Sequence, residues 1–198
     1  MEWKNDGGSG FENPEAGTYN AVCYRVIDIG TQENNYQGVI SQKPQVIIAW
    51  ELEETMKDGR PFVVSQFYTA SLNEKAKLRQ HMATWRGRDF TEAELQGFNP
   101  FNLIGAPCML SISVNDKGRS KVTGVAKLPK GLQPRKAVNP QCYLSLDKEN
   151  YDPAMFEMLS EGIKEIVRKS PEYQALSNKE LPTFNEGDFT DFENKIPF

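Results

Sequence analysis

Aromatic side chains stand close to cations at several points of the chain between positions 24 and 121. An aromatic ring can stack on a nucleobase, at about 1–3 kcal/mol per base, while lysine and arginine neutralise the phosphates of the same strand. This combination predicts a surface that binds single-stranded nucleic acid with little sequence preference. The candidate contacts are Tyr24, Arg25, Tyr36, Lys43, Trp50, Arg60, Phe62, Tyr68, Trp85, Arg86, Arg88, Lys117, Arg119 and Lys121.

Each candidate aromatic also has a structural interpretation. Trp50 and Phe67 flank apolar runs, which favours core positions for both. Trp85 shares a helical stripe with apolar neighbours and can anchor that helix in the core. Phe62 and Tyr68 share one face of an expected strand, but the alternation does not decide which face is wet. Tyr36 lies in a polar stretch and is the aromatic that a core explains least.

The formal net charge of −4 is concentrated at one end of the chain. Residues 186–198 hold four carboxylates and one lysine, so the rest of the chain is close to neutral. Residues 75–88 and 117–136 each carry several cations and no acid. Because local clusters set the field that a phosphate chain meets, these two segments remain compatible with nucleic-acid binding.

No arrangement typical of an enzyme stands out in the sequence. His81 is the single histidine, and phosphate-binding loops, dinucleotide fingerprints and zinc-protease motifs are missing. Cys23, Cys108 and Cys142 are widely spaced, which favours reduced, buried thiols over a zinc site. Glu51 and its neighbours Glu53 and Glu54 are interpreted as solvated carboxylates rather than metal ligands. We expect no catalysis, no cofactor and no metal.

Alternating and apolar runs predict five strands, at residues 18–29, 45–54, 61–69, 106–114 and 119–128. Residues 30–44 are expected to be a polar loop, and Asp58-Gly59 a hairpin turn. A helical period follows residue 71, and Thr91 with Glu94 forms an expected capping box. A further helix is expected from Pro153 to about Lys169, with one more turn at 172–176.

Three strands, a helix and a two-stranded hairpin follow one another in the order of an OB fold, a five-stranded, partly open β-barrel. We therefore expect a mainly β protein with added helices. In this fold the hairpin with Lys117, Arg119 and Lys121 corresponds to a loop that often binds oligonucleotides. The expected organisation is a flexible N-terminus (1–16), the OB domain (17–132), a loop and helical extension (133–176) and a flexible acidic tail (177–198).

The acidic stretch 186–198 closes on Ile196-Pro197-Phe198. It resembles the C-terminal tail of bacterial and phage single-stranded-DNA-binding proteins, which docks into basic pockets on replication and repair enzymes. Lys195 departs from that pattern, since carboxylates are usual there, and it should weaken docking. The alternative is a segment that packs back on its own domain. The resemblance implies partner contacts by Asp188, Asp191, Phe192, Glu193, Ile196, Pro197 and Phe198.

Four blocks in the body of the chain are similar to those of small phage-encoded single-stranded-DNA-binding proteins. They are Trp85-Arg-Gly-Arg, Thr91-Glu-Ala-Glu-Leu95, Leu103-Ile-Gly-Ala-Pro-Cys108 and Lys127-Leu-Pro-Lys-Gly131. The resemblance implies coating of single-stranded DNA in phage replication, recombination or repair, in the cytoplasm of the infected bacterium. It further implies that the tail recruits a polymerase, helicase, primase or nuclease.

Two further questions stay open on the sequence. A protein-interaction module that recruits or inhibits a host enzyme through the tail, without binding DNA, is the alternative function. The chain can also be a monomer or a homo-oligomer.

The longest apolar runs of the sequence are too short for a membrane span, and its first residues lack an apolar signal region.

Overall fold

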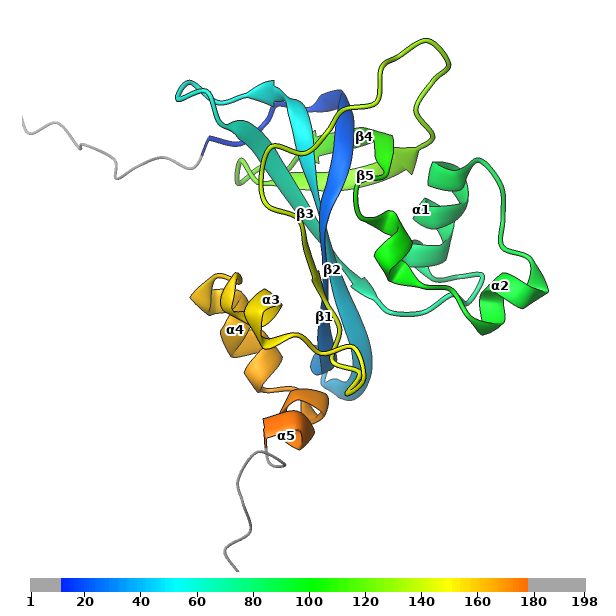
Figure 1. Cartoon of the computed structure of the whole chain (residues 1–198), viewed down its shortest axis with the longest axis vertical. Coiled ribbons are helices and arrows are strands. Elements are labelled where there is room, and N and C mark those ends of the chain that lie inside the picture. Colours follow the sequence, from blue (N-terminus) through cyan, green and yellow to red (C-terminus); the bar gives the residue numbers. More distant parts are fainter. Residues whose placement is uncertain (1–11, 178–198) are drawn as a thin grey trace, which may run out of the picture.

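The computed structural model describes residues 12–177 of the 198-residue chain, apart from the side chain of Tyr36. Its strands are β1 (Gly17–Tyr36), β2 (Val39–Thr55), β3 (Pro61–Thr69), β4 (Pro107–Val114), β5 (Ser120–Ala126) and β6 (Cys142–Leu144). Its helical segments are α1 (Lys77–Arg86), α2 (Glu92–Gln96), η1 (Pro100–Leu103), α3 (Pro153–Glu157), α4 (Glu161–Arg168) and α5 (Pro171–Ser177) (Figure 1).

Five antiparallel strands form one sheet in the order β3-β2-β1-β4-β5, and β6 adds to β1 in parallel. The prediction of a mainly β protein, with a helix between the third and fourth strands, is confirmed. Over residues 12–177 no ladder joins β3 to β5, so the sheet is open between its two ends. Helix α1 contacts both of these end strands.

Strand β1 changes partners along its length because two irregularities bend it. Register shifts lie between Cys23 and Arg25 and between Asp28 and Gly30. An extra residue in one strand increases its local twist and redirects its side chains. The first part of β1 therefore pairs with β4, and residues 25–27 pair with β6 instead.

Strands β1 and β2 are covered on both faces. On the inner face Trp50, Met82 and Trp85 belong to one buried cluster, with the rings of Trp50 and Trp85 centred 5.9 Å apart. On the outer face Ile27 and Ile47 pack with residues of β6, α3 and α4 in a second cluster. Strands buried on both faces carry no clear inside–outside alternation.

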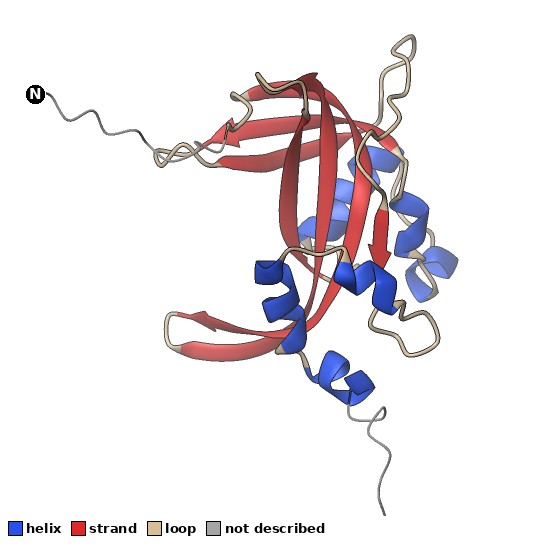
Figure 2. Cartoon of the chain, turned by 60° about the vertical axis from the view of Figure 1, so that its left-hand side comes forward, coloured by secondary structure: helices blue, strands red, loops and turns tan. Residues whose placement is uncertain are grey.

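The expected polar loop at residues 30–44 is wrong. Strands β1 and β2 continue as a two-stranded ribbon to a turn at Gln37 and Gly38, which have φ angles of 52° and 81°. Positive φ at both central residues suits the twist of a hairpin, and the Asn35 side chain accepts the Gly38 N–H. Figure 2 shows this ribbon projecting beyond the rest of the molecule.

The expected continuous helix from residue 153 to about 169 is also wrong. It is divided into α3 and α4, because Ser160 adopts an extended conformation before α4 begins. The break lets Phe156 and Leu159 reach the same outer cluster as Val167. The additional turn expected near residues 172–176 is confirmed as α5.

Candidate nucleic-acid interface

Helix α1 lies along β5 and joins the two basic segments of the sequence on one side of the molecule. Lys77 Nζ donates to the Val122 carbonyl at 3.2 Å, and Thr84 Oγ1 donates to the Val125 carbonyl at 2.6 Å. The backbone N–H of Lys127 donates to the Thr84 carbonyl at 3.1 Å. Residues 41 to 45 positions apart are thereby neighbours.

Three lysines along this contact form what we call the basic ridge: Lys77, Lys121 and Lys127. All three side chains are exposed. The Lys77 ammonium group is partly buried where it donates to Val122, and this desolvation, and secondly the charge of Lys121, lower the pKa of Lys77. The mutual repulsion of Lys77 and Lys121 would be relieved by an anion placed between them.

A cavity of about 720 Å³, the basic groove, adjoins the ridge at the C-terminal end of α1. Its walls are the segment from α2 to η1 and residues 127–132 with Pro134, which follow β5. Its lining holds the cations Arg86, Lys127 and Lys130 and one acid, Glu94. Half-buried Phe98 and the amides of Asn99 and Asn102 complete one wall. The groove thus offers charge for phosphates, an aromatic ring and polar groups for base edges.

Glu94 pairs with both arginines of this region that the sequence predicted as nucleic-acid contacts. Arg86 and Arg88 form ion pairs with its carboxylate, and the Arg86 guanidinium lies 4.5 Å from the centre of the Phe90 ring. Hydrogen bonds from Arg88, from the Thr91 N–H and from Arg86 hold the pKa of Glu94 well below its usual range. The predicted capping box of Thr91 and Glu94 is confirmed. These paired arginines offer less charge to a phosphate than the lysines of the ridge.

Four of the predicted stacking platforms are core residues, and the prediction is wrong for them. Trp50 is fully buried, and Tyr24, Tyr68 and Trp85 are at most 6% exposed. Trp85 donates its indole N–H to the Pro107 carbonyl at 2.8 Å, and the Tyr68 hydroxyl bonds to His81 Nδ1 at 2.8 Å. A ring enclosed in this way cannot stack on a base.

The face of β3 that carries the candidates Phe62 and Tyr68 is turned toward the core, and its other face is exposed. Phe62 is half-buried and packs against the inner core, like Tyr68. Phe67, expected in the core, is 46% exposed on the outer face beside Ser65 and Val63. The exposed aromatic of this strand is therefore Phe67, which the alternation could not identify.

The remaining candidates are spread over several elements. Arg25 is half-buried with its guanidinium 5.0 Å from the Tyr24 ring centre. Lys43 is exposed on the ribbon, and Arg60 forms an ion pair with Asp58 in the β2–β3 turn. The side chain of Tyr36 lies outside the described part of the chain. The three described residues, Arg25, Lys43 and Arg60, do not line the groove.

Among the predicted contacts, those of the β4–β5 hairpin fit best. Lys117, Arg119 and Lys121 are exposed, and Lys121 faces Lys77 of α1. The sequence prediction missed Lys77, Lys127, Lys130 and Phe98. The acid-free stretches 75–88 and 117–136 contained the signal for the three lysines. Their proximity depends on the packing of α1 against β5, which composition does not reveal.

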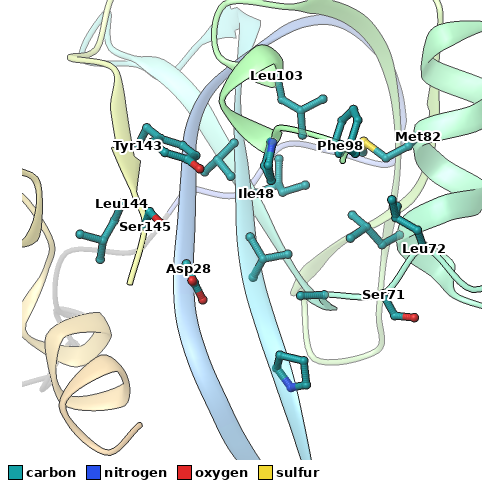
Figure 3. A pocket seen from close by; sticks show the side chains of 16 residues that line it. Asp28, Ile48, Ser71, Leu72, Met82, Phe98, Leu103, Tyr143, Leu144 and Ser145 are labelled. Atoms are coloured by element: carbon teal, nitrogen blue, oxygen red, sulfur yellow. The ribbon is translucent and has the colours of Figure 1, made fainter. Parts of the chain in front are cut away.

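A second cavity, of about 400 Å³, shares Phe98 and Leu103 with the basic groove (Figure 3). Its lining is mostly apolar, includes Ile48 and Met82, and contains no lysine or arginine among the described residues. Asp28 borders it, and burial raises the pKa of that carboxyl group. An apolar cavity with an acid at its edge does not suit a phosphate chain.

Residues 12–177 contain neither a metal cluster nor a membrane-spanning helix. No group of three or more His, Cys, Asp or Glu side chains in that range could hold a metal ion. None of the helices in the same range is long and apolar enough to cross a membrane. Cys23, Cys108 and Cys142 are buried, as expected. Glu51, expected to be solvated, is fully buried instead.

The acidic stretch lies beyond the described residues, and so do all of its predicted contacts. No protein-family model matches the chain, and no curated protein matches it either. The geometry of the ridge and groove therefore carries the functional conclusion.

Proposed function

We propose that this protein binds single-stranded DNA without sequence preference, through the basic ridge and the basic groove. The observation that carries the proposal is the packing of α1 along β5, which brings Lys77, Lys121 and Lys127 together beside a cavity that also contains Lys130. Lysines on a shared path neutralise successive phosphates and release their counterions. The proposed role is binding rather than catalysis.

The groove supports single strands better than a duplex. Phe98 and the apolar residues Leu128 and Leu132 can contact unstacked bases, while Arg86, Lys127 and Lys130 lie within the same cavity. Bases in a duplex are already stacked and keep their faces hidden. Stacking on an aromatic ring is tolerant of sequence because every base has a π-face.

We further propose that the sheet is an OB-type barrel left open between β3 and β5. The strand order, and α1 contacting both end strands, support that assignment. OB folds commonly bind oligonucleotides with the loop between their last two strands, which here carries Lys117 and Arg119. The biological setting proposed is coating of single-stranded DNA during phage replication, recombination or repair in the bacterial cytoplasm.

The acidic stretch is proposed to recruit a replication or recombination protein through Ile196, Pro197 and Phe198. Deleting these three residues should leave the affinity for DNA unchanged and remove capture of purified partner enzymes. A variant that captured its partner as well as the full chain would contradict the tail proposal and leave the DNA proposal standing.

The test of the central proposal is fluorescence anisotropy with a labelled dT oligonucleotide and a matched duplex. An external label is preferable to tryptophan emission because Trp50 and Trp85 are buried. We expect tighter binding to dT, and an affinity that falls steeply between about 50 and 200 mM salt. If neither the dT oligonucleotide nor the duplex bound, the result would contradict the proposal and favour the protein-interaction alternative.

A further inference from the structure

Glu51 is a buried acid near the C-terminal end of β2 that the proposed function leaves unexplained. Its side chain is fully buried on the outer face of the sheet, opposite its neighbour Trp50. A buried carboxylate is costly unless it is paired and hydrogen-bonded. Its partners therefore indicate what the acid is for.

The hydrogen-bond donors to Glu51 in the described chain come from one segment, residues 127–141, which we call the strap. Arg135 donates to Oε1 from Nε at 3.3 Å and from Nη2 at 3.1 Å. The Val138 N–H donates to both oxygens, at 2.9 and 3.0 Å. Asn139 donates to Oε2 from its backbone N–H at 2.9 Å and its side-chain amide at 2.8 Å.

These donors also determine the charge state of the acid. Burial alone would raise the pKa of Glu51, but the N–H groups of Asn139 and Val138, with Arg135, more than offset that effect. The net result is a pKa below the usual range, so the carboxylate stays ionised at neutral pH. An ionised acceptor forms stronger hydrogen bonds than a neutral one.

The strap needs such an anchor because it contains no helix or strand. It leaves β5 at Lys127, arches away from the sheet and runs back across β1 and β2 to β6 (Figure 1). Between its ends, Asn20 donates to the Gln133 carbonyl at 3.2 Å. The part from Lys127 to Pro134 forms one wall of the basic groove.

We infer that Glu51 is a positioning residue for nucleic-acid binding: it fixes the far end of the strap and so holds Lys127 and Lys130 against the groove. The inference rests on the proposed function. Glu51 itself touches no ligand in this arrangement. It acts through Arg135, Val138 and Asn139, which fix the path of the wall that the ligand meets.

Charge alone predicts the opposite result, which makes the inference testable. Removing an acid from a protein that binds phosphates strengthens binding through long-range electrostatics. Glu53 provides the matched control because it lies two residues away on β2 with an exposed side chain. Only the Glu53 backbone carbonyl takes part in the anchor, accepting from Arg135 Nη1 at 3.0 Å.

The experiment compares Glu51→Gln with Glu53→Gln in dT anisotropy titrations over a range of salt concentrations. We expect E51Q to bind dT at least tenfold more weakly than E53Q, with a shallower salt dependence. The new amide would place a donor against the N–H groups of Val138 and Asn139. Equal affinity of the two variants, with the wild type binding dT, would overturn the inference and leave the proposed function intact.

A second variant covers the case in which E51Q does not fold. Asn139→Ala removes one donor to Glu51 without changing the charge. This smaller change should leave a folded protein of somewhat lower melting temperature, and it should weaken dT binding in the same direction. Limited trypsin digestion gives a readout without DNA, because cleavage after Lys130 and Lys136 should be faster in E51Q and N139A than in E53Q. Faster cleavage with unchanged dT affinity would contradict the inference. If the wild type does not bind dT, the inference fails together with the proposed function.

Discussion

Trp50 and Glu51 are adjacent in β2, and their side chains point to opposite faces of the sheet. Trp50 contributes to the inner core, whereas Glu51 holds the strap. Each is suited to its face by chemistry, since an indole gains from burial and a carboxylate requires donors. Their neighbour Ala49 leaves room on the outer face beside Arg25, which pairs with it in the ladder.

His81 gives a prediction at the level of one side chain. Burial, and secondly the nearby charge of Lys77, lower the pKa of His81, whose ring bonds to the Tyr68 hydroxyl. An unfolded histidine has a pKa of about 6.5, so below that pH the unfolded chain takes up the proton more readily. The contribution of His81 to the free energy of unfolding should therefore be fully present above about pH 6.5. It should be lost as the pH decreases through the lower pKa of the folded state.

Urea denaturation of the wild type and of His81→Gln at pH 7.5 and 5.5 checks this expectation. The histidine contributes at most about 1.4 kcal/mol per pH unit, the value for one proton. Carboxylates titrate in both proteins and cancel in the comparison. An equal loss of stability in the two proteins on acidification would contradict the assignment.

At the scale of elements, the C-terminal helices hold the base of the β1–β2 ribbon. Glu172 of α5 accepts from the Thr31 backbone N–H at 2.8 Å and from its hydroxyl at 2.6 Å. Gln32 donates to the Ile166 carbonyl at 3.1 Å. The extension at residues 153–177 is therefore attached to the sheet rather than to the groove.

Gly30 makes that attachment possible and supplies the prediction at this scale. Its φ is +68°, and an added Cβ would lie 2.5 Å from Cβ of Ser170. Gly30→Ala should destabilise the fold by about 2–4 kcal/mol, from left-handed strain and overpacking together. Gly59→Ala is the control, because Gly59 has φ +83° with nothing within 4 Å.

Thermal denaturation of the two glycine variants separates strain from crowding. Gly59→Ala should lose only the strain contribution of about 1–2 kcal/mol. A Gly30→Ala protein no less stable than Gly59→Ala would show that the contact with Ser170 can relax without cost.

The elements also show how far the sequence can be interpreted. Alternating and apolar runs located β3, β4, β5 and the apolar parts of β1 and β2. Asp58-Gly59 marked a turn, and Thr91 with Glu94 marked a helix start. The sequence pattern did not predict the β1–β2 ribbon, because polar residues can form a ladder through their backbones alone, without an apolar face. Strand β6 was not predicted either, because three residues give no periodic signal.

The site was less predictable than the fold, for a physical reason. Strands β1 and β2 are covered on both faces, so the pattern around Tyr24 and Trp50 could not separate core rings from exposed ones. The basic segments were visible in the sequence, but their meeting depends on long-range packing such as that of Lys77 on Val122. Glu51 was misinterpreted because its donors lie more than 80 positions away.

In the whole molecule, one open sheet supports three separate parts of the structure. The inner core and α1 fix the ridge, the strap closes the groove, and the helical extension holds the ribbon. Arg86 and Arg88 are already paired with Glu94, so under the proposed function the exposed lysines supply most of the charge for phosphates. We therefore propose that Lys127 and Lys130 contact the phosphate chain.

The most direct test is the salt dependence of dT binding by the Lys127→Ala, Lys130→Ala double variant. Lys148→Ala is the control, since Lys148 is an exposed cation in a different part of the surface, near α5. The slope of log affinity against log salt should decrease by about 0.7 for each lysine–phosphate pair that is removed, or about 1.4 in the double variant. An unchanged slope and affinity in the double variant, with the wild type binding dT, would contradict the proposed interface.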